Sequence, residues 1–150
     1  MQLIGSSLFF VNYFLIGAWV GALLNVLSML RAIVYWKREL FRADKIIWVY
    51  AICLADIAVY VMSFTVFGTE PLLENFLVEL LPVAGIMLTT VSFYLGDARR
   101  VRFIGLFNAP LWLTYNIIVF TVGGIVCEAV GLCSIVIGIL RYDIRKKTKR

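Results

Sequence analysis

The lysine and arginine residues occur in only three regions of the chain, and long apolar stretches separate these regions. All 14 of them lie within 31–45, 99–102 and 141–150. A helix needs about 20 apolar residues to cross a hydrocarbon core of about 30 Å. Because lipid offers no hydrogen-bond partners, a crossing segment must satisfy its own backbone groups, as a helix does. The pattern therefore predicts an all-α integral membrane protein.

The composition agrees with this prediction and excludes several classes of protein. Hydrophobic residues make up 63% of the chain and charged residues 15%, whereas soluble domains have about 25% charged residues. A soluble domain of this size could not hide so much apolar surface. The chain has no histidine, the commonest general base and metal ligand. We therefore expect no enzymatic activity, no metal, no cofactor and no nucleic acid partner.

Turn-forming residues divide the apolar stretches into six predicted transmembrane helices. The first thirty residues carry no charge and would form a helix of about 45 Å, so we place a turn between Gly17 and Gly21. The long run after Phe103 is divided in the same way at Gly123 and Gly124. The predicted helices cover 3–18, 20–36, 46–67, 76–95, 103–120 and 123–141.

The basic clusters also predict an orientation. Loops 36–45 and 96–102 and the tail carry lysine and arginine, and the three intervening turns carry none. Cytoplasmic loops are enriched in these residues, so we expect both termini in the cytoplasm. The basic tail is expected to anchor this topology, or to contact anionic lipid.

Three cysteines, Cys53, Cys127 and Cys133, fall inside apolar runs. Free cysteine behaves as a small hydrophobic residue. We therefore expect buried thiols here, with no disulfide framework and no metal site.

The two ends of the chain are similar to each other. Ile4-Gly5 matches Ile104-Gly105, Tyr13 matches Tyr115, and Val20-Gly21 matches Val122-Gly123, with an offset of 100 to 102. Two halves with one orientation form a parallel repeat, as in some small transporters. We therefore divide the chain into an incomplete first bundle of two helices (1–36), a linker helix (46–67), a triple-helix bundle (76–142) and a basic cytoplasmic tail (143–150). A complete arrangement would have one more helix before Met1.

Several short motifs resemble the YgjV-type bacterial inner-membrane proteins. They are Gly21-Ala22-Leu23-Leu24-Asn25, Glu79-Leu80-Leu81-Pro82-Val83-Ala84-Gly85, Tyr115-Asn116 and Val122-Gly123-Gly124-Ile125-Val126-Cys127-Glu128. The family is grouped by fold similarity with the SWEET and PQ-loop transporters. The resemblance implies SWEET-like triple-helix bundles joined by a linker helix, in the bacterial inner membrane.

Glu128 is the first candidate for a substrate-binding residue. A carboxylate inside a membrane helix costs roughly 2.5 to 3.5 kcal/mol on insertion scales and is usually functional. It could carry a proton, accept hydrogen bonds from a polar solute, or bond to a neighbouring helix. The resemblance implies that an asparagine on the third helix of each bundle lines the pocket. Asn25 matches this position in one half, and Glu128 lies close to it in the other.

Helix 103–120 carries two further candidates, Trp112 and Asn116, which lie on one face because they are four residues apart. Trp112 could stack on a flat solute or fill the core. The resemblance implies a hinge at Pro82, where proline removes a backbone donor, and Gly85 permits bending or close helix contact. For Asp56, inside the linker helix, we expect a structural partner such as a hydroxyl.

Two functions agree with these features. The first is a small secondary transporter or facilitator, whose partners are membrane lipid and a small polar solute or proton. The alternative is a structural or partner-binding membrane protein, in which a homodimer supplies what the short first bundle lacks.

Overall fold

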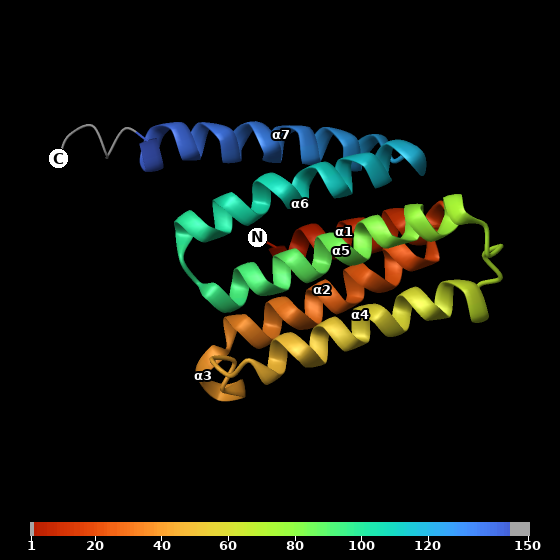
Figure 1. Ribbon diagram of the computed structural model, residues 1–150, viewed down its shortest axis with the longest axis horizontal. Helices are drawn as coiled ribbons and strands as arrows, with labels where there is room; N and C mark the ends of the chain where they lie inside the picture. The colour runs from red at the N-terminus through yellow and green to blue at the C-terminus, as the bar shows by residue number, and fades with distance from the viewer. Residues whose placement is uncertain (1, 145–150) are drawn as a thin grey trace.

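The computed structural model describes residues 2–144, and these are almost entirely helical (Figure 1). The predicted basic tail lies outside this range beyond Ile144. Consecutive long helices run in opposite directions, so α2, α5 and α7 point the same way. The helices are α1 (Gln2–Leu15), α2 (Trp19–Trp36), α3 (Arg38–Phe41), α4 (Ile47–Thr65), α5 (Leu73–Leu95), α6 (Ala98–Ile118) and α7 (Val122–Gly138), which continues into the π-helical segment η1 (Ile139–Ile144).

Each of the six predicted helices coincides with an observed long helix. Within the described residues, four helical segments are long and apolar enough to cross a membrane: α2, α4, α5, and α7 extended to Tyr142. Helix α1 has only 14 residues, and α6 carries three arginines and two asparagines. The fold is therefore that of a helical membrane protein.

The start of α6 differs from the prediction, which placed 96–102 in a loop. Gly96 ends α5 with a φ of +63°, a conformation that glycine adopts without strain. Asp97 then caps α6, because its side chain accepts a hydrogen bond of 3.3 Å from the Arg100 amide. The basic residues of this region therefore form the first turn of a helix.

Two hairpins, α1–α2 and α6–α7, turn with the same geometry. The amide of Ala18 donates to the Tyr13 carbonyl at 2.9 Å, and that of Thr121 donates to the Asn116 carbonyl at 2.8 Å. Gly17 and Phe120 both have positive φ, +75° and +55°. Each of these three residues of the second turn lies 103 positions after the equivalent residue of the first turn. The structural offset of 103 residues replaces the offset of 100 to 102 that the sequence suggested for the repeat. Short sequence matches can be misaligned by a few positions.

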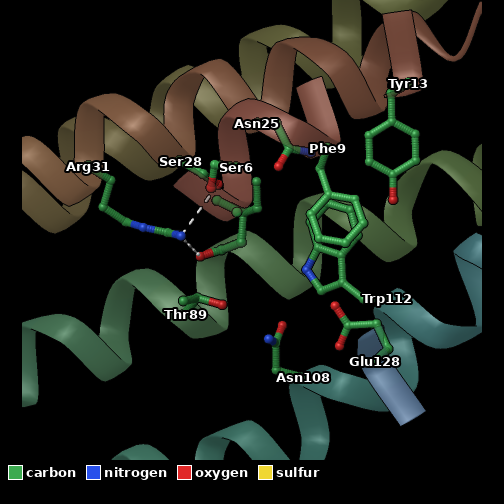
Figure 2. A pocket seen from close by; sticks show the side chains of 12 residues that line it. Ser6, Phe9, Tyr13, Asn25, Ser28, Arg31, Thr89, Asn108, Trp112 and Glu128 are labelled. Atoms are coloured by element: carbon green, nitrogen blue, oxygen red, sulfur yellow. Dashed lines mark hydrogen bonds between the residues drawn. The ribbon is translucent and has the colours of Figure 1, made fainter. Parts of the chain in front are cut away.

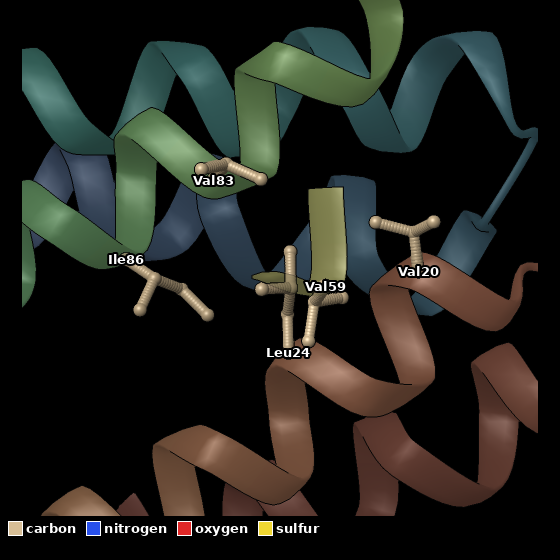
Figure 3. Close-up of a cluster of buried hydrophobic side chains, with 5 residues drawn as sticks. All are labelled: Val20, Leu24, Val59, Val83 and Ile86. Carbon is tan, nitrogen blue, oxygen red and sulfur yellow. The ribbon is translucent and has the colours of Figure 1, made fainter. Parts of the chain in front are cut away.

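The apolar core lies between α2, α4 and α5 (Figure 3). Val20 and Leu24 of α2 pack against Val59 of α4 and against Val83 and Ile86 of α5. These residues repeat at intervals of three or four along α2 and α5, which places them on one face of each helix. The core therefore joins the first hairpin to the linker helix and to α5.

Helix α7 is the least buried of the four candidate membrane spans. Among its residues only Gly124 is buried, and Cys127 and Cys133 are exposed. The expectation of buried thiols is therefore wrong for these two cysteines. The lipid-facing side of a membrane helix is as apolar as its packed side, so an apolar run does not reveal which side a thiol occupies.

Candidate functional site

A cavity of about 220 Å³ lies among α1, α2, α5, α6 and α7, which Figure 2 shows from close by. Its wall is mixed, with aromatic rings on one side and polar groups on several helices. The polar and charged side chains are Ser6, Asn25, Ser28, Arg31, Thr89, Asn108 and Glu128, and the larger apolar or aromatic ones are Phe9, Tyr13, Ile86 and Trp112.

Three of the four predicted substrate-binding residues line this cavity: Asn25, Trp112 and Glu128. Asn25 is buried, and its Nδ2 donates a hydrogen bond of 2.9 Å to the Gly21 carbonyl. Glu128 is half-buried, and its carboxylate lies near Trp112 and Asn108 (Figure 2). Within the described part of the chain, no donor forms a hydrogen bond or ion pair with Glu128.

Asn116, the fourth predicted residue, lies outside the cavity lining and connects the two hairpins. Its Oδ1 accepts a hydrogen bond from the Tyr13 hydroxyl, and its side chain is 1% exposed. Gly124 of α7 packs directly against Asn116, where any larger residue would collide with the amide. The geometry gives Asn116 a structural role between α1, α6 and α7.

The two predicted hinge residues lie in the middle of α5. The helix continues from Leu73 to Leu95 through Pro82, and Pro82 is buried together with Val83. A Cβ atom on Gly85 would lie 2.5 Å from Trp112 Nε1 and 3.0 Å from Asn108 Oδ1. Gly85 therefore permits the close helix contact that places Trp112 against the cavity. Hinge motion at Pro82 stays a prediction.

Arg31, which the sequence analysis assigned to a basic cluster, forms part of the cavity wall. Its side chain is 2% exposed. Nη1 donates to the Ile86 carbonyl at 3.1 Å and to Thr90 Oγ1 at 3.2 Å, and Nη2 donates to Ser28 Oγ at 3.4 Å. The sequence signal that could have identified Arg31 as a site residue is its position inside an apolar segment, five residues before Trp36.

Asp56 of α4 is fully buried, and its charge interacts with that of Arg31 across the α2–α4 interface. Neither carboxylate oxygen accepts a hydrogen bond from a described residue. The expected hydroxyl partner is therefore wrong. The positive charge of Arg31 on the neighbouring helix offsets part of the cost of burying this carboxylate.

The sequence analysis did not identify two other polar residues, Asn108 and Glu79. Asn108 Oδ1 is buried without a hydrogen bond, and its position four residues before Trp112 predicts that both face the cavity. Glu79 lines a second cavity of about 330 Å³, together with Thr69 and Tyr115. As a carboxylate inside an apolar helix, Glu79 could have been found by the argument that identified Glu128.

An aromatic layer lies between the two cavities. Tyr13 lines the first and Tyr115 the second, and their ring centroids are 5.9 Å apart. Gly21 lies against both rings, since a Cβ there would be 3.1 Å from the Tyr115 hydroxyl and from Tyr13 Cγ.

Metal binding has no support in the described residues, where histidine, cysteine, aspartate and glutamate form no group of three or more. The cavity is instead suited to a small molecule that forms hydrogen bonds, because it combines apolar walls with a few polar groups.

The comparisons with known proteins give a family and no closer relative. No curated protein and no solved structure matches the chain. The profile of the Imp-YgjV family, described as a bacterial inner membrane protein, matches residues 1–146, which include every residue of the cavity wall. The chain therefore belongs to the Imp-YgjV family of bacterial inner membrane proteins.

Proposed function

We propose that this protein is a small secondary transporter or facilitator, which moves a small polar metabolite across the inner membrane through the cavity between its hairpins. One observation carries the proposal: a cavity with seven polar or charged side chains lies inside a bundle of membrane helices. Polar groups at membrane depth are costly, and they usually mark substrate or ion pathways.

The proposed topology has six membrane spans, formed by α1, α2, α4, α5, α6 and α7, with both termini in the cytoplasm. The alternating helix directions agree with this count (Figure 1). The concentration of lysine and arginine in 31–45, 99–102 and 141–150 agrees with the orientation. On this topology the hairpin α1–α2 and the hairpin α6–α7 form a parallel repeat around α4.

The register of 103 residues supports the repeat at the cavity. Positions on the two hairpins that differ by 103 line the same cavity in three cases. They are Gly5 with Asn108, Phe9 with Trp112, and Asn25 with Glu128. Transporter sites commonly lie near the bilayer midplane at the interface of two repeats, and this cavity has that position in the proposed topology.

Two glycines offer a matched test of the proposal. A Cβ atom on Gly5, which lines the cavity, would meet nothing within 4 Å, and the same holds for Gly131 of α7, outside the lining. Leucine at Gly5 therefore fills the cavity, whereas leucine at Gly131 adds apolar surface away from it.

The experiment measures solute flux into liposomes that contain the purified protein, by osmotic swelling with a panel of small polar solutes. We expect at least one solute to enter faster than in empty liposomes, Gly5→Leu to abolish this flux, and Gly131→Leu to preserve it. If no solute enters faster, the transport proposal fails and the structural or partner-binding alternative takes its place. If both variants retain the flux, the proposed route through this cavity fails.

A further inference from the structure

We infer that the solute of this cavity is a small organic cation with N–H donors, held by Glu128 and the surrounding aromatic rings. This inference rests on the proposed function and specifies its substrate class. It follows from the unequal environments of the two charged residues in the cavity wall, Arg31 and Glu128, which lie at opposite ends of the view in Figure 2.

At one end, the positive charge of Arg31 is partly compensated within the protein. Its guanidinium donates three hydrogen bonds to Ile86, Thr90 and Ser28, and it lies 5.3 Å from the centre of the Phe93 ring. The charge of Asp56 acts on it from α4. Three of its five N–H donors are thus used within the protein, Nε forms no hydrogen bond with a described residue, and Asp56 offsets part of the positive charge.

At the other end, the carboxylate of Glu128 has no such compensation. None of the described residues donates a hydrogen bond to it or pairs with it. An isolated carboxylate in apolar surroundings is costly unless a cation or hydrogen-bond donors accompany it. Among residues 2–144 no cation pairs with this carboxylate, so a bound cation would complete the site.

The polar groups near Glu128 include free hydrogen-bond acceptors, which suit a solute that donates hydrogen bonds. Asn25 already uses its Nδ2 on the Gly21 carbonyl, which leaves its Oδ1 as an acceptor in the cavity wall. Asn108 Oδ1 also accepts no hydrogen bond, and it is buried against Gly85. An ammonium group has three donors and no acceptor. It can therefore satisfy Glu128 and an asparagine oxygen at the same time.

The aromatic rings at this end favour the same class of solute. Phe9 and Tyr13 stack with centroids 6.0 Å apart, and the Tyr13 and Trp112 centroids are 6.4 Å apart. Aromatic faces attract cations electrostatically and form the cages that recognise ammonium groups. A carboxylate next to such rings would repel an anion, and a neutral polyol would leave the charge of Glu128 uncompensated.

The size of the cavity limits the solute. A volume of about 220 Å³ lies below the range of about 300–1,000 Å³ that is usual for pockets that bind drug-sized ligands, so the cavity suits a small solute. The hydroxyl groups of Ser6 and Ser28 lie in the remaining wall, where they suit a hydroxyl or a second amine. The solute is thus a compact amine with a polar tail.

Four solutes of similar size test the charge preference directly: aminobutanol, butanediol, hydroxybutyrate and aminobutyrate, each with its functional groups at opposite ends. Binding is followed by Trp112 fluorescence in lipid nanodiscs, with Trp19, Trp36 and Trp48 replaced by phenylalanine. We expect aminobutanol to bind about tenfold or more tightly than butanediol, because a charged hydrogen bond contributes about 1.5–3 kcal/mol. Hydroxybutyrate should not bind, and aminobutyrate should bind more weakly than aminobutanol.

Two carboxylate variants then test which cavity produces the preference for the cationic solute. Glu128→Gln should remove the advantage of aminobutanol over butanediol, and Glu79→Gln, in the other cavity, should retain it. The inference is overturned if aminobutanol does not bind, if butanediol or hydroxybutyrate binds equally well, or if Glu128→Gln keeps the preference. The first two outcomes need no variant, so they hold even if Glu128→Gln fails to fold.

The liposome assay separates this inference from the transport proposal. If aminobutanol binds in a Glu128-dependent manner but does not cross the membrane, the substrate class stands and transport fails. If butanediol crosses as fast as aminobutanol and Gly5→Leu blocks both, transport stands and the cation preference fails.

Discussion

At the residue scale, single glycines decide how closely the helices around the cavity approach one another. Gly85 faces the Trp112 indole, Gly21 faces Tyr13 and Tyr115, and Gly124 faces Asn116. Small residues of this kind let membrane helices pack closely. The large side chains of the site thus occupy space that glycines on neighbouring helices leave free.

Gly85→Ala should destabilise the protein and displace Trp112. The added Cβ would lie 2.5 Å from the indole nitrogen, and overpacking of this kind costs about 1–3 kcal/mol. The measurement is the melting temperature in detergent together with Trp112 fluorescence. Gly131→Ala is the control, since a Cβ there meets nothing within 4 Å and should leave both quantities unchanged. An equal response of the two variants would contradict the close contact.

Tyr13→Phe should also destabilise the protein, because it removes the donor to Asn116 Oδ1. A buried acceptor left without a partner costs about 1–3 kcal/mol. The free energy of unfolding is measured by titration with a denaturing detergent. Tyr50→Phe serves as the control, because Tyr50 is 67% exposed on α4. If Tyr13→Phe is as stable as the wild type, the hydrogen bond does not hold the hairpins together.

The residues of the site were predictable from the sequence where their chemistry is unusual for a membrane helix. Glu128 and Trp112 were identified in this way and Asn25 through the family resemblance, and all three line the cavity. Arg31 was missed because a charge near a helix end is normally a topology signal. Its burial depends on partners contributed by α5, and no local pattern reveals such partners.

At the scale of elements, the contact between α2 and α4 contains a charge on each side. Arg31 of α2 and Asp56 of α4 interact without forming a close ion pair, and both are almost completely buried. Removing one member of a buried pair leaves the other charge uncompensated. The linker helix is therefore attached to the first hairpin by electrostatics as well as by the core around Leu24 and Val59.

A double-mutant cycle with Arg31→Met and Asp56→Leu tests this attachment. Each single variant should lose stability, because the remaining buried charge then lacks its partly compensating partner. Since the two groups form no close ion pair, we expect a coupling energy of about 0.5–3 kcal/mol. The double variant should lose clearly less than the sum of the two losses. The free energy of unfolding is measured for all four proteins in one detergent, and additive losses would show that the two charges are independent.

The helices themselves were predictable because turn-forming residues mark their ends. Gly17 and Gly96 have positive φ, and both lie where the sequence indicated a boundary. The α6–α7 turn depends instead on Phe120, whose φ of +55° is unusual for a residue other than glycine. The neighbouring glycines Gly123 and Gly124 suggested the correct reversal, although they lie inside α7.

At the scale of the whole molecule, apolar residues cover both the packed and the outward-facing helix surfaces. Ile4, Leu8 and Leu15 of α1 and Val122, Val126 and Val130 of α7 are all more than half exposed. In a soluble protein the contrast between polar and apolar faces indicates the core. Here the sequence could predict where the helices lie, but this missing contrast prevented it from predicting which side of each faces the cavity.

Labelling of single cysteines should show the proposed orientation. In a background without Cys53, Cys127 and Cys133, a cysteine replacing Thr69 should react with a membrane-impermeant thiol reagent added to spheroplasts. Cysteines replacing Glu39 or Asp97 should react only after permeabilisation, because they lie in the regions rich in lysine and arginine that face the cytoplasm. The opposite pattern would invert the topology, and labelling of all three from one side would contradict the six spans.

The sparse packing of α7 has a consequence for the environment in which the protein should be studied. Only Gly124 of this helix is buried and most of its other residues are exposed, so in the proposed topology acyl chains contact much of the element that carries Glu128. Changes in the thickness or order of these chains shift a membrane helix at a cost of fractions of a kcal/mol per Å. The bilayer therefore helps to position the helix that carries Glu128, and detergents of different chain length should place Glu128 differently in the cavity wall.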